Sequence, residues 1–276
     1  MNIGLIGCGK VGTSLFCLIK KNNRIIGVYD VKKRNQQRAV KYLNLVKNVS
    51  HEEICIRSQA LFFATPDDKI AIAFTKAKPF LEGEKYVFHF SGFLPSTIFS
   101  KSKKIHRGSI HPFTTFPEII LPPVRQKYSL FIEGDKPALR AARQIFKSPY
   151  FTVKKITKHN KAKYHLIGVF SSNLLVGLIS AIEGLSRDIG WTKKDTDDVI
   201  LPIIKTTLGN VLKNGVQNAL SGPLERGDIS TIKKHLKILQ KNKNLSNIYR
   251  TLSLAVLKNI LITDNKRKME ELLNTF

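Results

Sequence analysis

The sequence predicts a doubly wound α/β domain followed by an all-helical domain. Up to about residue 155, short runs rich in Val, Ile, Phe and Tyr alternate with stretches of helical periodicity. This alternation is typical of βαβ units in a mostly parallel sheet. Beyond that point the pattern changes and only helical stretches follow. We therefore expect two domains, residues 1–155 and 156–276.

The elements can be placed by their flanking residues, because turn formers bound the strands and apolar residues three or four apart mark the helices. The expected strands are Asn2–Gly7, Arg24–Asp30, Ala60–Thr65, Tyr86–Phe90, Ile105–Ile110 and Ser129–Glu133. The helices between them are Val11–Lys21, Gln36–Leu43, Asp67–Lys78 and Pro137–Phe146. The second domain is expected to hold helices near His159–Gly190, Lys193–Asn214, Ser230–Gln240 and Leu245–Leu261. Asp67 or Asp68 is well placed to cap its helix.

Composition indicates a globular protein with a strongly basic surface. The chain has 276 residues, of which 42% are hydrophobic, so it can bury a substantial core. Lys and Arg total 46 against 20 Asp and Glu, a formal charge of +26. The 34 Lys and 12 Arg are scattered along the chain, whereas base readers favour arginine. We interpret the charge as a solvated surface without nucleic-acid binding; a preference for anionic ligands is the alternative.

Cysteine content and the first residues give expectations about compartment. The three cysteines, Cys8, Cys17 and Cys55, have no metal-ligand spacing, so we expect neither disulfides nor a metal site. The opening residues lack the basic region and cleavage site of a signal peptide. We expect a cytoplasmic protein that does not enter membranes.

One uncharged segment, Leu166–Ile182, needs a separate interpretation. It runs for 17 residues, includes Ser171, Ser172 and Asn173, and is shorter than the roughly 20 residues of a membrane span. A helix that is apolar almost all round is otherwise buried in a core or a subunit interface. We expect a buried helix here.

A glycine-rich turn is the strongest local motif. It follows an apolar run at the N-terminus and opens an amphipathic helix, the context that makes it a dinucleotide-binding fingerprint. The motif is Gly7-Cys8-Gly9-Lys10-Val11-Gly12. Gly7 would permit the tight turn, Gly9 the approach of a pyrophosphate, and Gly12 the helix–strand contact. The free N–H groups at the helix start would then meet the phosphate charge.

The end of the second strand bears on cofactor choice. Asp30 lies 18 residues after Gly12, where a carboxylate would bind the adenine ribose and repel a 2′-phosphate. We therefore expect NAD rather than NADP. The run Lys32-Lys33-Arg34 follows at once and could cradle a 2′-phosphate instead, or could be a solvated helix start.

Polar residues follow three further strands of the first domain. Thr65 and Pro66 should border the cofactor cleft, because ligands bind outside the carboxyl ends of parallel strands. Ser91 follows the next strand, and His111 closes the one after it. A histidine at a cleft-facing strand end is a candidate proton donor, although a lone histidine is more often structural.

The helical domain offers a second polar group. His165 and Asn173 are eight residues apart and share a helix face, with Ser172 beside it. They could contact a substrate or the nicotinamide amide, or form a helix–helix hydrogen bond instead. Further on, Arg226 could clamp a substrate carboxylate. Alternatively, Asp228 caps the next helix and Arg226 pairs with it.

Taken in order, these motifs resemble a family of Rossmann-like oxidoreductases with a C-terminal helical domain of unknown function. The family is related to pyrroline-5-carboxylate reductase and, more distantly, to the β-hydroxyacid dehydrogenases. The matching groups are the glycine fingerprint, Ser91-Gly92, His111-Pro112-Phe113, Tyr164-His165, Ser172-Asn173, Leu201-Pro202 and Gly222-Pro223 with Arg226-Gly227-Asp228. The resemblance implies a dimer formed through the helical domain and an active cleft near Ser91, His111, His165 and Asn173. Members often have a Ser-Arg pair after the second strand, where this chain has Asp30-Val31, which argues against NADP.

The sequence therefore predicts an NAD(P)-dependent reductase or dehydrogenase that transfers a hydride to or from a C=O or C=N group. Its substrate would be a small anionic metabolite, with His165 or His111 supplying the proton, Asn173 orienting the substrate and Arg226 holding its anionic group. The alternative is a non-catalytic protein that senses a dinucleotide or binds a polyanion. Fold alone does not decide between them.

Overall fold

The computed structural model describes residues 1–46, 49–260 and 265–275. The chain divides into two compact units, residues 1–173 and 174–276, and each is described by itself. The last strand of the first unit ends at Lys155, where the sequence pattern changes, and the helix that follows still packs with the first unit. We call the two parts the sheet unit and the helical unit.

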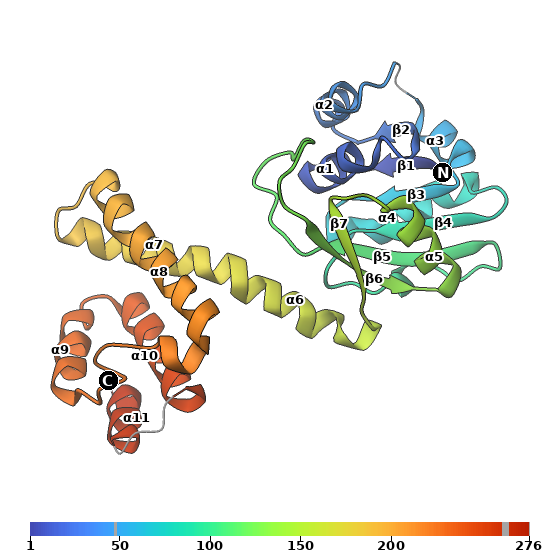
Figure 1. Ribbon diagram of the computed structural model, residues 1–276. Coiled ribbons are helices and arrows are strands. Elements are labelled where there is room, and N and C mark those ends of the chain that lie inside the picture. Colours follow the sequence, from blue (N-terminus) through green and yellow to red (C-terminus); the bar gives the residue numbers. More distant parts are fainter. Residues whose placement is uncertain (47–48, 261–264, 276) are drawn as a thin grey trace. The chain divides into compact units, whose positions relative to one another are not determined.

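A seven-stranded sheet forms the centre of the sheet unit (Figure 1). The strands are β1 (Asn2–Ile6), β2 (Arg24–Tyr29), β3 (Ala60–Phe63), β4 (Lys85–His89), β5 (Ile105–Pro112), β6 (Tyr128–Gly134) and β7 (Phe151–Lys155). Their order is β2-β1-β3-β4-β5-β6-β7, and only the β5–β6 pair is antiparallel. The predicted doubly wound domain is confirmed. Since β1 to β5 are parallel, their carboxyl ends share one edge of the sheet.

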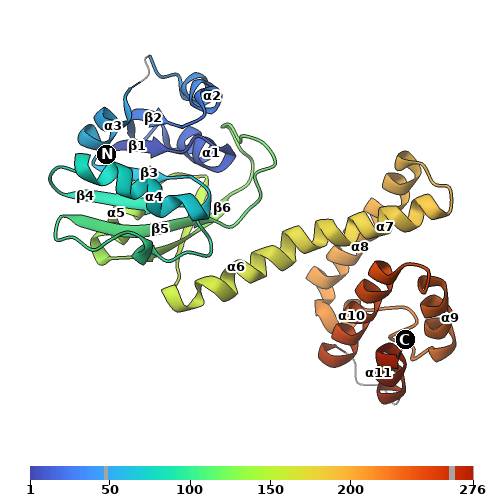
Figure 2. The same ribbon diagram turned by 180° about the vertical axis from the view of Figure 1, so that it is seen from behind.

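Helices cover both faces of this sheet (Figure 2). They are α1 (Lys10–Ile19), α2 (Lys33–Leu43), α3 (His51–Arg57), α4 (Asp67–Ala77) and α5 (Lys136–Ile145). Alternate residues of β3 face opposite sides of the sheet: Phe62 belongs to the core that includes α1, α2 and α5, whereas Leu61 and Phe63 belong to the core that includes α3 and α4. Such burial on both faces explains why β3 is a continuous apolar run.

A long helical stretch, Lys158–Asp188, follows the last strand. It contains α6 (Lys161–Val169), a π-helical turn (Phe170–Leu174) and α7 (Leu175–Asp188). Among the described residues it is the one helix whose length and composition would suffice to cross a membrane, so the expectation of a segment too short to span does not hold. None of its most apolar window is buried within the chain. Burial in the chain's own core is therefore wrong, and burial in a subunit interface stays a prediction.

The helical unit consists of α7, α8 (Lys193–Ala219), α9 (Ile229–Leu239), α10 (Lys243–Asn259) and α11 (Lys266–Thr275). Gly215 interrupts α8 with a φ of 78°. Leu261, the expected end of the helix that corresponds to α10, lies outside the described residues. A small core joins α9, α10 and α11, built from Ile232, Leu236, Leu257, Met269 and Leu273.

Candidate functional site

The glycine-rich turn between β1 and α1 has steric demands that differ from one glycine to the next. Gly7 has a φ of 96°, and a Cβ there would lie 2.6 Å from the backbone of Ala64. A Cβ on Gly12 would meet Ala64 Cβ at 2.7 Å, but a Cβ on Gly9 would meet nothing within 4 Å. Helix α1 begins after Gly9 without a side-chain cap. The turn is thus closely packed at Gly7 and Gly12 and open at Gly9, beside the uncapped helix start.

A cavity of about 590 Å³ opens beside this turn. It lies where the chain order reverses between β1 and β3, the switch point at which doubly wound sheets bind ligands. Predicted cofactor residues in its wall are Gly7, Gly9, Asp30, Lys32, Thr65 and Pro66. The Oγ1 atom of Thr65 is buried without a hydrogen-bond partner. A buried hydroxyl of this kind calls for a partner, and a ligand in the cavity could supply one.

The remaining predicted cofactor residues serve the turn itself or lie outside the cavity wall. The backbone N–H of Cys8 donates to Asp30 Oδ2 at 2.7 Å, and burial raises the pKa of the Cys8 thiol to about 12. Lys10 Nζ donates to the carbonyl of Pro117. Val11 packs partly buried against the core, and Arg34 is not among the lining residues. Cofactor binding by these residues stays a prediction.

Asp30 faces the cavity with both carboxylate oxygens already engaged by backbone. Its Oδ1 accepts from Lys32 N at 2.8 Å, opposite the Cys8 contact on Oδ2. Lys32, Lys69 and Lys76 also line the cavity. A carboxylate can accept further hydrogen bonds, so Asp30 can still meet a ribose, while the lysines offer charge for a phosphate.

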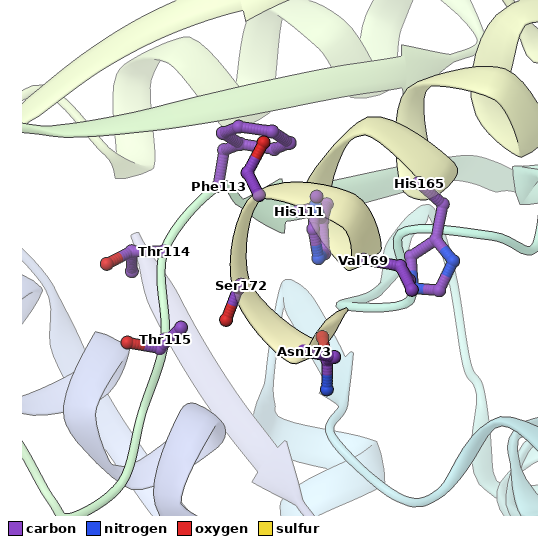
Figure 3. Close-up of a pocket in the computed structure, with 10 residues that line it drawn as sticks. His111, Phe113, Thr114, Thr115, His165, Val169, Ser172 and Asn173 are labelled. Atoms are coloured by element: carbon purple, nitrogen blue, oxygen red, sulfur yellow. The ribbon is translucent and has the colours of Figure 1, made fainter. Parts of the chain in front are cut away.

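A second cavity, of about 310 Å³, is the histidine pocket (Figure 3). Its walls come from the end of β5 with the loop after it, and from α6 with the π-helical turn. The lining residues are His111, Phe113, Thr114, Thr115, His165, Gly168, Val169, Ser171, Ser172 and Asn173. The structure therefore brings four predicted site residues together, namely His111, His165, Ser172 and Asn173.

Gly92, in the turn after β4, lies between the two imidazoles. A Cβ on Gly92 would lie 2.8 Å from His111 Nε2 and 2.8 Å from His165 Cδ2. The centroids of the two rings are 6.3 Å apart. A side chain at position 92 would therefore displace one or both imidazoles, so the turn at Gly92 bears on the spacing of the two histidines.

His111 is held as a neutral imidazole. Its Nδ1 lies 2.6 Å from Tyr164 Oη, and burial, with the charges of Lys161 and His165, lowers its pKa to about 4. Burial also raises the pKa of Tyr164, so the phenol keeps its proton. The consistent assignment is that Tyr164 donates to Nδ1 and that Nε2 of His111 carries the ring proton, on the side of Gly92.

The hydroxyl of Ser91 is fully used within its turn and does not line the pocket. It donates to Asp67 Oδ2 at 2.6 Å and accepts from the N–H groups of Phe93 and Leu94 at 3.2 and 2.9 Å. A catalytic role for Ser91 stays a prediction. The expected capping of α4 by Asp67 or Asp68 is wrong, because α4 has no side-chain cap and Asp67 binds Ser91 instead.

Sequence reasoning missed a buried lysine beneath this site. Lys161 is 1% exposed, and its Nζ donates to Ser91 O at 3.0 Å and to Ser109 Oγ at 2.9 Å. No local signal separates it from the exposed Lys158 and Lys163 nearby, since its burial is a tertiary property. Tyr164 was noticed only as part of the resemblance.

Arg226 and Asp228 lie in the helical unit. Asp228 caps α9 by accepting from Thr231 N at 3.0 Å, as one of the two sequence interpretations expected. The side chains of Ser230 and Thr231 also donate to it, and these bonds lower the Asp228 pKa to about 2. Arg226 is exposed, and a substrate contact by it stays a prediction.

A doubly wound sheet, a glycine turn at its switch point and a following helical region define the class: a Rossmann-like fold with a C-terminal helical part. Residues 128–256 match the family model described as a domain of unknown function, DUF2520. This part of the chain thus matches that domain, and the resemblance expected from the sequence is confirmed for the domain and for the Rossmann-like fold. No protein with a curated description matches the chain.

Solved structures share the fold along most of the chain. A provisionally assigned NADP oxidoreductase from Bacteroides fragilis is 21% identical with a TM-score of 0.74, covering 92% of this chain and 97% of its own. A semialdehyde dehydrogenase NAD-binding protein from Cupriavidus necator, solved with calcium and NAD, is 19% identical with a TM-score of 0.63. The match covers 99% of this chain and 98% of its own. The Plasmodium falciparum pyrroline carboxylate reductase with NADP bound is 18% identical, with a TM-score of 0.58, and the match covers 98% of this chain and 98% of its own. At such identities the likeness supports the fold alone.

Proposed function

We propose that this protein is an NAD(P)-dependent oxidoreductase that transfers a hydride to or from a C=O or C=N group of a small anionic metabolite. One observation carries the proposal: both cavities lie at the carboxyl edge of the parallel strands. The cavity beside Gly7 and Thr65 follows β1 and β3, and the histidine pocket follows β5. The loop after β5, which lines the histidine pocket at Thr114 and Thr115, also contacts the start of α1, because the Pro117 carbonyl accepts from Lys10.

The residues of the first cavity fit a dinucleotide. Gly9 leaves open space at an uncapped helix start, where a pyrophosphate would meet free N–H groups. Thr65 offers a hydroxyl without a hydrogen-bond partner among the described residues, and Asp30 and Lys32 line the part of the cavity where the adenine ribose of the dinucleotide would bind. When bound, the nicotinamide supplies or accepts the hydride. We propose NAD as the preferred cofactor, because the Asp30 carboxylate would repel the 2′-phosphate of NADP. Lys32, Lys69 and Lys76 in the cavity wall argue the other way, because they could bind that phosphate.

The second cavity supplies the polar groups for proton transfer. His111, neutral and hydrogen-bonded to Tyr164, is suited to hydrogen-bond a carbonyl or imine through its Nε2–H. His165, partly exposed on the opposite wall, is the proposed proton donor. Asn173 and Ser172 would orient the substrate, and Arg226 is the proposed clamp for its anionic group.

The proposed assembly is a homodimer formed through the helical domain. Apolar side chains of α7 and α8 stand in solvent in the single chain: Val176 is 64% exposed, Ile203 61% and Leu212 88%. Exposed apolar surface on this scale typically marks a protein–protein contact. A second copy of the same chain would also cover the apolar helix that its own core leaves bare.

The function is tested by binding first and by turnover second. A thermal-shift titration with NADH and NADPH, at low and physiological salt, should show a salt-resistant shift; saturation at 100 times Kd adds about 2.7 kcal/mol. A panel of 2-oxo acids and cyclic imino acids is then screened for nucleotide oxidation at 340 nm.

The matched variants are His165→Asn and His159→Asn, the latter an exposed histidine just before the same helix. His165→Asn should lower turnover by about 10²–10⁴-fold with unchanged nucleotide binding, while His159→Asn leaves both unchanged. No shift with either nucleotide would sink the proposal. Binding without turnover across the panel would favour a dinucleotide sensor instead.

A further inference from the structure

Lys161 stands out because its charge lies in the interior and forms no direct ion pair with any residue that the structure describes. The side chain is 1% exposed, and its ammonium donates to the Ser91 carbonyl at 3.0 Å and to Ser109 Oγ at 2.9 Å. Both acceptors are neutral. Burying an ammonium group costs free energy unless polar groups replace its hydration, so such a lysine calls for an explanation.

The two acceptors belong to the segments that build the histidine pocket. The Ser91 carbonyl is part of the peptide that leads into Gly92, the residue fitted between the imidazoles. Ser109 lies two residues before His111 on β5, on the same strand face. On α6, Lys161 and His165 are four residues apart and share a helix face. One ammonium group therefore ties together the turn, the strand and the helix that carry Gly92, His111 and His165.

Titratable groups face Lys161 from four elements. Glu133 on β6 accepts from Ser109 Oγ at 3.1 Å, and Asp67 on α4 accepts from Ser91 Oγ at 2.6 Å. His89 on β4 and His111 on β5 are the two imidazoles that its charge acts on. Burial lowers the Lys161 pKa to about 8, while Glu133 and Asp67 oppose that shift. Burial lowers the pKa of His89 to about 3 and that of His111 to about 4, and in both the ammonium adds to the shift.

We propose that Lys161 is a positioning residue of the histidine pocket: its ammonium ties the Ser91–Gly92 peptide to β5 and α6, and so fixes the spacing of the two imidazoles beside its charge. His165 is then left to deliver the proton, while His111 serves as a neutral hydrogen-bond donor. The inference rests on the proposed function in that it takes this pocket as the reaction site. It predicts that the tie between the Ser91–Gly92 peptide, β5 and α6 weakens once Lys161 loses its own proton, on the alkaline side of about pH 8.

The test is a titration of the histidine side chains by NMR, with carbon-13-labelled imidazoles in the full chain and no nucleotide or substrate present. Lys161→Met removes the ammonium and keeps the length of the side chain. Lys163→Met is the matched control, because it removes the same charge from an exposed position two residues away. Lys161→Arg restores a charge at the buried position.

In Lys161→Met the His111 pKa should rise by about one unit from its value near 4, as expected on losing a nearby like charge. Lys163→Met should leave it unchanged, and Lys161→Arg should bring it back toward the unsubstituted value. An equal His111 titration in Lys161→Met and the unsubstituted protein would overturn the proposal, as would an equal rise in Lys163→Met.

A second measurement keeps the proposal testable if Lys161→Met does not fold. Carbon-13 signals of the lysine ε-carbons are followed with pH in the unsubstituted protein, and the Lys161 signal is the one missing from Lys161→Arg. Titration near pH 8 supports the proposal, whereas titration near 10.5 contradicts it. Neither experiment involves a nucleotide, so failure here leaves the hydride-transfer proposal intact, and failure of nucleotide binding leaves this one intact.

Discussion

The sheet unit and the helical unit differ in how they dispose of their apolar residues. In the sheet unit both faces of the sheet are covered, and Phe62 is fully buried among the rings of Phe16, Phe88, Phe90 and Phe146. Among the described residues of the helical unit, five buried side chains from α9, α10 and α11 form a small core. On α7 and α8, by contrast, many apolar side chains are exposed to solvent, and the exposed fraction reaches 88% at Leu212.

This difference in burial indicates two distinct reasons why a segment of the sequence is apolar. In the sheet unit the apolar residues of the strands and of the inner faces of α1 to α5 are accounted for by packing within one chain, although single residues such as Val31 and Val46 are exposed. The apolar positions of α7 and α8 are not accounted for in this way, because exposed leucine and valine contribute nothing to the stability of a monomer. Their occurrence is explained if another surface covers them, which is the reason for proposing a second copy of this chain.

The largest expected effect lies in the sheet unit, at Gly7. Gly7→Ala places a Cβ 2.6 Å from the Ala64 backbone at a φ of 96°, so both steric overlap and backbone strain oppose it. We expect a loss of about 2–4 kcal/mol of unfolding free energy together with nucleotide binding. Urea denaturation and a nucleotide titration measure the two effects.

Gly9→Ala is the matched control for that substitution. A Cβ on Gly9 meets nothing within 4 Å, so the unfolding free energy should stay within about 1 kcal/mol. Nucleotide binding should still weaken, because the methyl group enters the space left for the pyrophosphate. Equal destabilisation by both substitutions would show that the turn is not packed as described. Unimpaired nucleotide binding by the Gly9→Ala variant would show that the pyrophosphate does not bind beside Gly9.

An intermediate effect is expected in the helical unit, on assembly rather than folding. Leu212→Glu places a charge on the exposed apolar surface of α8 and should convert the expected dimer to a monomer by light scattering. Ile238→Glu on α9, where Ile238 is 69% exposed, is the control and should leave the dimer intact. A monomeric unsubstituted protein would contradict the dimer outright.

The smallest effect concerns the cap of α9. The side-chain and backbone bonds from Thr231 and Ser230 lower the Asp228 pKa from 3.8 to about 2. A depressed carboxyl pKa stabilises the folded state above about pH 4, and this contribution disappears as pH falls from 4 to 2. Asp228→Asn keeps the capping oxygen but does not titrate. Its melting temperature should therefore depend less on pH than that of the unsubstituted protein between pH 4 and 2; parallel curves would contradict the cap.

The sheet unit was predictable wherever a local pattern specifies the outcome. All six expected strands lie within one or two residues of β1 to β6, because turn formers bound each apolar run. Helix α3 was missed although its signal is present: Ser50 Oγ accepts from Glu53 N at 3.1 Å, the spacing of an N-terminal cap. Helix α11 of the helical unit was also not predicted from the sequence.

The candidate site was predictable only where residues follow strand ends. His111 and the glycine turn could be placed from the βα pattern, since carboxyl ends of parallel strands meet at one edge. Lys161 could not, because its burial depends on contacts with Ser91 and Ser109, far apart in sequence. Leu166–Ile182 was expected to be buried in a core or in a subunit interface; burial in the chain's own core is wrong, because hydrophobicity indicates that a surface needs covering but not what covers it.

The close fit of Gly92 has a consequence for inherited variation in the gene. Glycine is the only amino acid without a β-carbon, so every missense change of its codon introduces one. At this position that atom would fall 2.8 Å from both imidazoles. Every missense allele of codon 92, even the smallest change to alanine, should therefore encode a protein in which one or both imidazoles of the histidine pocket are displaced.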